Sequence, residues 1–269
     1  MKFSILIAHY NNWDYFQECY KSIINQTYKN FEIVIVDDCS TDDSYNLLLE
    51  LAKTDNRIKI FQNSENKKVG FTKMRCAEEA LGDICMFVDP DDIISHTALE
   101  EISKEFAKNP YIVATYSKIK LIDEDSKPVG FFKLSKKIQN NKKYFFNINF
   151  EVAHLFSFKR EIYLKTTGIN PQLTSAVDQD LYLKLYELGN FKFINSYQYL
   201  YRLHSKGVSQ DKSKKEILNS NWHTVLLDTC KRRNIESLGN KKLDSIDNLP
   251  KLLFAKENTL IKKIVRKFL

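Results

Sequence analysis

The fold is indicated by two stretches of the sequence, FEIVIVDDCSTD at residues 31–42 and ICMFVDPDD at residues 84–92. Each stretch begins with a short apolar run and ends in a cluster of acidic residues. Such runs are typical of buried strands in a parallel sheet. In open α/β sheets, ligands bind in the crevice beyond the carboxyl ends of the strands. We therefore expect both clusters to face one crevice, where carboxylates are costly unless they hold a cation or accept hydrogen bonds from ligand hydroxyls.

The first 120 residues alternate between strand-like and helix-like patterns. Apolar runs predict strands at residues 3–8, 31–36, 58–61, 84–88 and 111–120. Helical spacing of apolar residues predicts helices at residues 13–25, 45–52, 70–81 and 97–107. This alternation favours an α/β fold with a mostly parallel sheet flanked by helices.

The pattern changes after residue 120. We expect a basic loop, a helix, two short strands and a further helix, at residues 127–143, 180–188, 191–194, 197–203 and from 212 onward. A boundary near Asp211 would divide the chain into a domain of residues 1–210 and a helical C-terminal extension of residues 211–269.

Composition limits the class of protein. The 269 residues are 43% hydrophobic and 28% charged, which is ordinary for a globular protein. The net charge of +7 fits an anionic substrate, an anionic membrane, nucleic acid or simply a solvated basic surface. Among these we expect no nucleic-acid partner.

The cysteines and the N-terminus bear on location. The 5 cysteines include no CxxC pair, so neither a zinc site nor a disulfide framework is expected, and reduced thiols fit the cytosol. The first apolar run is too short for a signal peptide, and no stretch approaches the roughly 20 apolar residues of a membrane span. We expect a cytoplasmic protein.

The segment Asp89-Pro90-Asp91 has the chemistry of a cation site. In an extended segment, residues two apart project to the same side, and proline stiffens the segment. The two carboxylates therefore converge, and hard cations such as Mg²⁺ and Mn²⁺ prefer such oxygen ligands together with substrate phosphates. The alternative is an acidic turn that precedes the helix at Thr97.

Seven segments, in this order, resemble the family 2 glycosyltransferases, which have the GT-A fold. They lie at residues 4–11, 26–28, 36–42, 70–75, 87–92, 178–181 and 201–204. The resemblance covers residues 1 to about 210. It implies a Rossmann-like nucleotide-binding sheet, with residues 1–92 as the nucleotide-sugar half and residues 93–210 as the acceptor half.

The resemblance assigns nucleotide contacts to the first half of the chain. Asp38 corresponds to the acid that accepts a hydrogen bond from the uracil N–H. The alternative is that Asp37 and Asp38 both stabilise the turn after the strand or cap the next helix. Ala8 and Tyr10 lie where the family contacts the base, and Ala8 can offer only its backbone. Arg75 corresponds to an arginine that faces uracil or phosphate, with a surface salt bridge as the alternative.

The resemblance also implies a metal site. Asp91 would ligate Mn²⁺ or Mg²⁺, and Asp89 would contact the ribose or a metal-bound water. Arg202 and His204 correspond to basic residues near the diphosphate, and His204 could ligate the metal. The alternative for His204 is a surface histidine without a ligand.

Asp178 corresponds to the family's general base, with Val177 in place of the usual glutamate. It would take the proton of an acceptor hydroxyl that attacks the anomeric carbon opposite the leaving UDP, which inverts the configuration. Asp180 is the alternative base. Asp178 could instead cap the helix that begins beside it.

These assignments predict an inverting, metal-dependent transfer of sugar from a UDP-sugar to a glycan or lipid-linked acceptor. The expected setting is bacterial surface polysaccharide or lipopolysaccharide synthesis, with the acceptor chosen by residues 127–150. Two other enzyme classes fit less well. A sugar-nucleotide pyrophosphorylase would need a glycine-rich phosphate loop after the first strand, where this sequence has HYNN at residues 9–12. A haloacid-dehalogenase phosphatase would carry its DxD motif after the first strand, whereas Asp89-Pro90-Asp91 follows the fourth. A catalytically inactive sugar-nucleotide or membrane-binding module remains the alternative function.

The last residues form a separate pattern. In residues 258–269, apolar pairs alternate with basic pairs about every four residues. As a helix, this segment would have one apolar and one cationic face. It could lie on an anionic membrane, which predicts peripheral association, or it could dock on the catalytic domain.

Overall fold

The computed structural model describes residues 1–205 and 215–259, and its first half is built as the sequence predicts. Four parallel strands pair in the order β3-β2-β1-β4. They are β1 (Phe3–His9), β2 (Phe31–Asp37), β3 (Ile58–Gln62) and β4 (Ile84–Phe87). Because β1 and β2 pair from Phe3↔Phe31 to His9↔Asp37, their carboxyl ends are level.

The sheet continues beyond β4 as a mixed sheet in the order β4-β8-β6-β9-β5. Its strands are β5 (Ile93–Ile94), β6 (Ile112–Ile122), β8 (Ser157–Lys159) and β9 (Asn190–Arg202). Strand β8 is antiparallel to β4 and β6, whereas β9 is parallel to β6. The two strands expected at residues 191–203 are thus one strand, with a register shift opposite Ser117 and Lys118.

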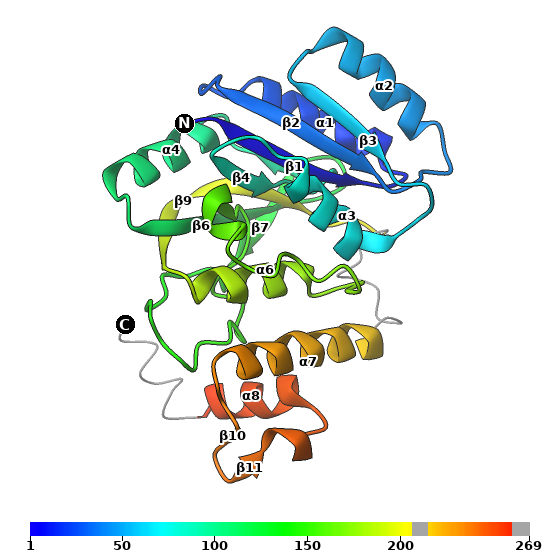
Figure 1. The fold of residues 1–269 in the computed structure, drawn as a ribbon. Helices are drawn as coiled ribbons and strands as arrows, with labels where there is room; N and C mark the ends of the chain where they lie inside the picture. Colours follow the sequence, from blue (N-terminus) through cyan, green and yellow to red (C-terminus); the bar gives the residue numbers. More distant parts are fainter. Residues whose placement is uncertain (206–214, 260–269) are drawn as a thin grey trace.

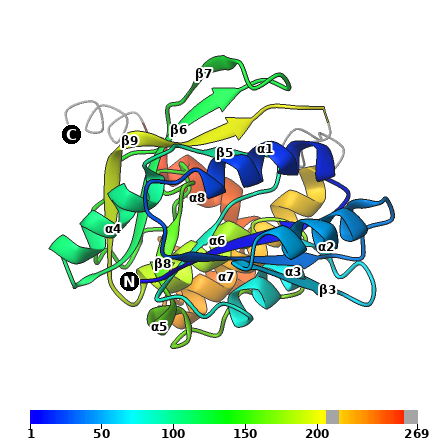
Figure 2. The same ribbon diagram turned by 90° about the horizontal axis from the view of Figure 1, so that it is seen from above.

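The predicted loop at residues 127–143 contains a strand. Strand β7 (Pro128–Phe132) pairs with β6 and extends at one edge of the molecule (Figure 2). Its Val129 and Phe131 side chains are exposed. Phe132 packs, only partly buried, against the core, and Pro128 and Gly130 are residue types that are uncommon in strands, which is why the sequence pattern suggested a loop.

Helices cover both faces of the sheet (Figure 1). Helices α1 (Trp13–Ile24), α2 (Ser44–Thr54) and α4 (Ala98–Lys108) pack with Phe3, Ile5 and Ile7 of β1 in one buried cluster. Helices α3 (Lys68–Glu78) and α6 (Val177–Tyr186) pack with Leu6 and Val34 in a second cluster on the other face. The short helix α5 (Arg160–Tyr163) follows β8. This alternation along β1 is what a sheet buried on both faces requires.

The C-terminal helices lie beyond α6 and share its core. They are α7 (Lys215–Arg232) and α8 (Leu249–Glu257), joined through β10 (Ser237–Leu238), β11 (Lys241–Lys242) and a 3-10 helix (Leu243–Ser245). Val225 of α7 and Leu253 of α8 belong to the same buried cluster as Leu181 of α6. The helical extension is therefore packed on the sheet domain (Figure 1).

Two predictions fall on residues outside the described ranges. The boundary near Asp211 lies within residues 206–214, so the division of the chain there stays a prediction. Residues 260–269, most of the basic C-terminal segment, are also outside. Within residues 1–205 and 215–259, no helix is long and apolar enough to cross a bilayer.

Candidate functional site

The strand ends bring the acidic clusters to one edge of the sheet, as predicted. Phe87 of β4 lies opposite Leu6 of β1, and the backbone N–H of Val88 continues the pairing by donating to the Leu6 carbonyl. Asp89 therefore leaves the sheet beside the end of β1. The side chains of Asp89 and Asp91 are 28% and 25% exposed, so both reach the surface at this edge of the sheet.

Lys73 lies between Asp89 and Asp178. Its Nζ atom is 3.1 Å from Oδ1 of Asp89 and 2.9 Å from Oδ1 of Asp178. The lysine side chain is 6% exposed, whereas that of Asp178 is 31% exposed. Sequence reasoning missed Lys73, because a lysine within a helical pattern ordinarily indicates a solvated face and its partners are distant in sequence.

The charges around Lys73 shift two pKa values. Burial works against the charged ammonium, but the carboxylates of Asp178 and Asp89 outweigh it and raise the pKa of Lys73 above its ordinary value. Burial likewise works against an ionised Asp89, and the ammonium of Lys73 outweighs it, so the pKa of Asp89 is lowered. Both groups are therefore charged at neutral pH.

A close helix contact places Lys73 against the segment that leads to Asp178. The backbone N–H of Gly70 donates to the carbonyl of Leu173, and a Cβ atom at Gly70 would lie 2.3 Å from that oxygen. Lys73 is one turn further along α3, on the same side as Gly70. Glycine at position 70 is thus required for the approach that brings Lys73 to Asp178.

Asp91 and His204 are brought together, although 113 residues separate them. Nε2 of His204 is 2.8 Å from Oδ2 of Asp91, and the imidazole ring lies 4.9 Å from the ring of Tyr15. Burial, followed by the neighbouring charge of Asp89, raises the pKa of Asp91. A divalent cation between these groups would relieve that repulsion.

The donor atoms fit a divalent cation that also binds phosphate. Within residues 1–205 and 215–259, no three His, Cys, Asp or Glu side chains converge as a ready-made metal cage. Mg²⁺ sites in nucleotide enzymes ordinarily use one or two carboxylates, with waters and substrate phosphates completing the shell. The carboxylate of Asp91 is a suitable ligand for Mn²⁺ or Mg²⁺ of that kind, and the imidazole of His204 adds a nitrogen ligand that suits a transition metal such as Mn²⁺ better than Mg²⁺.

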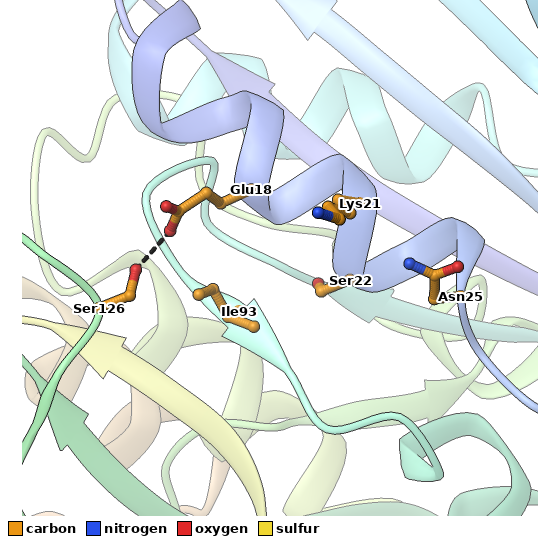
Figure 3. Close-up of a pocket in the computed structure, with 6 residues that line it drawn as sticks. All are labelled: Glu18, Lys21, Ser22, Asn25, Ile93 and Ser126. Atoms are coloured by element: carbon orange, nitrogen blue, oxygen red, sulfur yellow. Dashed lines mark hydrogen bonds between the residues drawn. The ribbon is translucent and has the colours of Figure 1, made fainter.

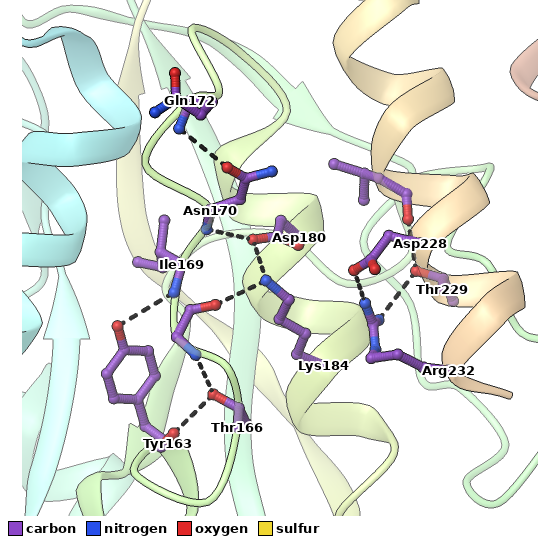
Figure 4. Close-up of polar contacts among 12 residues, drawn as sticks. Tyr163, Thr166, Ile169, Asn170, Gln172, Asp180, Lys184, Asp228, Thr229 and Arg232 are labelled. Carbon is purple, nitrogen blue, oxygen red and sulfur yellow. Dashed lines mark hydrogen bonds and ion pairs between the residues drawn. The ribbon is translucent and has the colours of Figure 1, made fainter.

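Asp178 and Asp180 have different surroundings, although both lie in the first turn of α6. Asp180 is 2% exposed, and its Oδ2 accepts hydrogen bonds from the backbone N–H of Asn170 and from Lys184 Nζ, each at 2.8 Å (Figure 4). These bonds give Asp180 a structural role, and its alternative role as the base stays a prediction. Ala176 occupies the N-cap with φ 57°, and the Asp178 carboxylate binds Lys73.

The acids after β2 are enclosed by their own chain. Asp37 is fully buried and accepts hydrogen bonds from Ser40 and Gln62. Asp38 is 4% exposed, and its carboxylate accepts from Asn63 Nδ2 at 2.8 Å and from the backbone N–H groups of Lys67 and Lys68 at 2.8 and 2.9 Å. These bonds give Asp38 the turn role left open above, and its contact with uracil stays a prediction.

The other nucleotide residues of the first half lie around the same loop. Arg75 donates from Nη1 to the carbonyl of Gln62 at 2.6 Å and to Oδ1 of Asn63 at 2.8 Å. It therefore supports the loop after β3, and its predicted contact with uracil or phosphate is untested. Ala8 is partly buried and Tyr10 is 42% exposed, both at the end of β1.

Arg202 has contacts within the protein that the sequence pattern did not predict. Its guanidinium is fully buried, and it donates to the carbonyl of Asp91 at 2.7 Å, to the carbonyl of Glu124 at 3.1 Å and to Oε2 of Glu18 at 2.6 Å. In this structure the guanidinium is occupied by these partners, and its predicted contact with the diphosphate stays a prediction. Arg202 stabilises the backbone of Asp91. Sequence reasoning missed this role because the residues that surround Arg202 are distant from it in sequence.

A separate hollow lies behind Arg202. It has a volume of about 330 Å³ and is lined by α1, β5 and the loop after β6, with Glu18 and Ser126 on its wall (Figure 3). Ser126 also accepts a hydrogen bond from Arg202. None of Asp89, Asp91 and Asp178 lines this hollow, so it is separate from the acids at the strand ends.

His154 is a further neighbour that sequence reasoning left without a role. Its Nε2 atom is 3.9 Å from Oδ2 of Asp89, and its ring stacks on that of Tyr199 with centroids 4.9 Å apart. Tyr199 in turn accepts a hydrogen bond from the backbone N–H of Asp89. Asp89 is therefore held from the sheet side by an aromatic pair and from α3 by an ammonium.

Similar solved structures have the same fold. Residues 1–349 of S. aureus TarS, in complex with UDP-GlcNAc, align with a TM-score of 0.69 and 19% identity, covering 95% of this chain and 71% of that one. The mannosyltransferase PcManGT from Pyrobaculum calidifontis, in complex with GDP-Man and Mn²⁺, aligns with a TM-score of 0.65 and 13% identity, covering 99% and 79%. These likenesses confirm the predicted GT-A architecture.

Relatives in sequence are longer proteins. Chondroitin synthase of Escherichia coli is 30% identical over 96% of this chain, which spans 37% of that protein. Hyaluronan synthase of Pasteurella multocida is 28% identical over 94% of this chain, which spans 25% of it. Residues 4–166, more than half of the chain, match the family described as glycosyl transferase family 2. The chain therefore belongs to glycosyl transferase family 2.

Proposed function

We propose that this chain transfers a sugar from a UDP-sugar to a hydroxyl of a glycan or lipid-linked acceptor, with inversion and with the help of Mn²⁺ or Mg²⁺. The observation that carries the proposal is the gathering of Asp89, Asp91 and Asp178 at one strand edge, each at least a quarter exposed. Acids so placed can serve a cation, a donor and an acceptor at once.

The comparisons support the donor class and the setting. One structural neighbour was solved with UDP-GlcNAc, and two sequence relatives are named as synthases of chondroitin and hyaluronan. We infer a UDP-hexose or UDP-N-acetylhexosamine donor and a role in bacterial surface polysaccharide synthesis. Lipopolysaccharide is one polymer of this class.

In the proposed reaction, Asp178 is the base. Its Oδ1 atom is bound to Lys73, so Oδ2 accepts the proton of the acceptor hydroxyl. As that proton leaves, the hydroxyl oxygen forms a bond to the anomeric carbon, and the bond from that carbon to the diphosphate breaks. UDP departs with the electron pair on its phosphate oxygen, and attack from the opposite face inverts the centre.

Asp91 and His204 would hold the cation, which when bound neutralises charge on the departing diphosphate. Asp89 would face the ribose. Arg202 would keep the Asp91 backbone in place, through the 2.7 Å bond from its Nε atom to the carbonyl. The positive charge of a bound cation would offset the repulsion between the like charges of these carboxylates.

The second candidate is an inactive sugar-nucleotide or membrane-binding module. The acids at the site do not favour it, since a binding module has no use for a base beside the donor site.

Peripheral contact with an anionic membrane through residues 258–269, on the cytoplasmic side, is part of our proposal for a lipid-linked acceptor.

The deciding experiment measures UDP release. Purified protein would be incubated with UDP-glucose, UDP-galactose, UDP-GlcNAc and UDP-GalNAc, with and without Mn²⁺ and an oligosaccharide acceptor. We expect acceptor-dependent UDP release with one of these donors, abolished by a chelator. If the donors stabilise the protein against heat but none is turned over with any acceptor, the protein is an inactive sugar-nucleotide-binding module and the proposed transferase activity is wrong.

A further inference from the structure

Lys73 is the charged residue that joins the two halves of the site. It lies on α3, and its ammonium contacts Asp89, 16 positions ahead, and Asp178, which is 105 positions away. The lysine side chain is 6% exposed, and the ring of Phe87 lies 5.3 Å from Nζ. A lysine desolvated in this way needs both carboxylates to remain charged.

The contacts form a bridge and not a simple pair. Oδ1 of each carboxylate lies within 3.1 Å of the same nitrogen, one from the donor side of the crevice and one from the acceptor side. Removing the ammonium would leave these carboxylates facing each other, and like charges so placed repel. The position of Asp178 relative to Asp89 is therefore set by Lys73.

We propose that Lys73 is a positioning residue, which holds Asp178 at a fixed distance from the donor site before either substrate binds. This inference rests on the proposed function. It predicts two effects that would not be expected if Lys73 were only structural. Loss of Lys73 lowers turnover more than donor affinity. It also increases the affinity of the empty site for a divalent metal ion, because the ammonium of Lys73, which repels that ion, is gone.

Lys184 provides a matched control. It is also 6% exposed and also pairs with a buried acid, Asp180, at 2.8 Å, but its Nζ atom points toward the loop before α6, where it donates to the carbonyl of Gly168 at 2.7 Å (Figure 4). Lys184→Met thus removes a buried ammonium from an equivalent pair without touching the strand edge. Any loss that both variants share is the cost of breaking a buried ion pair.

The experiment compares Lys73→Met, Lys184→Met and the unmodified chain below the melting temperature of all three. For Lys73→Met we expect kcat to fall about 30-fold or more relative to Lys184→Met, with the Kd for UDP in saturating Mn²⁺ changed less than about three-fold. Titration of Mn²⁺ alone, followed by its electron paramagnetic resonance signal, should show about three-fold or tighter binding to Lys73→Met.

Equal kcat in Lys73→Met and Lys184→Met, or weaker Mn²⁺ binding to Lys73→Met, would overturn the inference. Should Lys73→Met fail to fold, the Mn²⁺ titration compares Lys73→Met/Asp178→Asn with Asp178→Asn, since the double variant leaves fewer unpaired charges. There, unchanged or weaker Mn²⁺ binding counts against the inference and tighter binding supports it. The Mn²⁺ readout needs no sugar donor, so it remains decisive if the proposed transferase activity is not found.

Discussion

The two acidic clusters that follow β2 and β4 have similar sequences but opposite surroundings. Asp37 and Asp38 are 0% and 4% exposed, and their oxygens are occupied by donors of residues 40–68 and, for Asp37, by Nδ1 of the buried His9 at 3.4 Å. Asp89 and Asp91 are 28% and 25% exposed and contact cationic or ionisable side chains from distant elements. The first cluster stabilises a turn, and the second is open to a ligand. The exposure of the side chains, and not the presence of the acids, distinguishes a structural cluster from one that is open to a ligand.

The largest effect that would sharpen this comparison is on turnover. Asp178→Asn is nearly isosteric but cannot accept a proton, so we expect turnover to fall by about 100-fold or more, with donor affinity within a few-fold. Asp180→Asn, its structural neighbour, should instead lower the melting temperature. Initial rates and melting curves of the two variants separate these effects. If Asp180→Asn abolishes turnover in a folded protein while Asp178→Asn retains it, the base has been assigned to the wrong residue.

The next effect is on metal dependence. Asp91→Ala removes the carboxylate that contacts His204, so UDP binding should no longer strengthen when Mn²⁺ is added. Calorimetric titration of UDP with Mn²⁺ and with a chelator measures this in each protein. His204→Ala should weaken the same dependence. Equal UDP affinity under both conditions in the unmodified chain would mean that the open cluster does not hold a cation.

A smaller effect is expected in the enclosed cluster. Asp38→Asn replaces a carboxylate oxygen, which accepts from backbone N–H groups, with an amide that presents a donor to them. The resulting unpaired groups should cost about 1–3 kcal/mol of the free energy of unfolding. Denaturant unfolding measures this loss. A second measurement, UDP affinity of the folded variant, decides whether Asp38 also contacts uracil, since a purely structural acid leaves that affinity unchanged.

The comparison also shows what the sequence can predict. Strands β1, β2 and β4 were predictable because their short apolar runs are continuous and buried on both faces, and the strand ends then placed Asp89 and Asp91 at one edge of the sheet. Strand β7 was not, because its residues are at most partly buried and include Pro128 and Gly130, which are uncommon in strands. The role of Lys73 depends on Asp178, 105 positions away, together with Asp89, and that of Arg202 on residues 78 to 184 positions away, so no local pattern reports them.

The smallest effect concerns the C-terminal segment, which lies outside both clusters and mostly outside the described residues. Deleting the residues after Asn258 should leave UDP binding intact and reduce binding to anionic vesicles. Lys262, Lys263, Arg266 and Lys267 would each contribute about 1 kcal/mol near an anionic surface. Salt screens such charges, so vesicle binding by the full chain should fall as salt rises to physiological strength. Co-sedimentation with vesicles, together with melting curves of both proteins, tests this against the docked alternative. A segment docked on the catalytic domain would lower the melting temperature when removed, and vesicle binding would be negligible in both proteins.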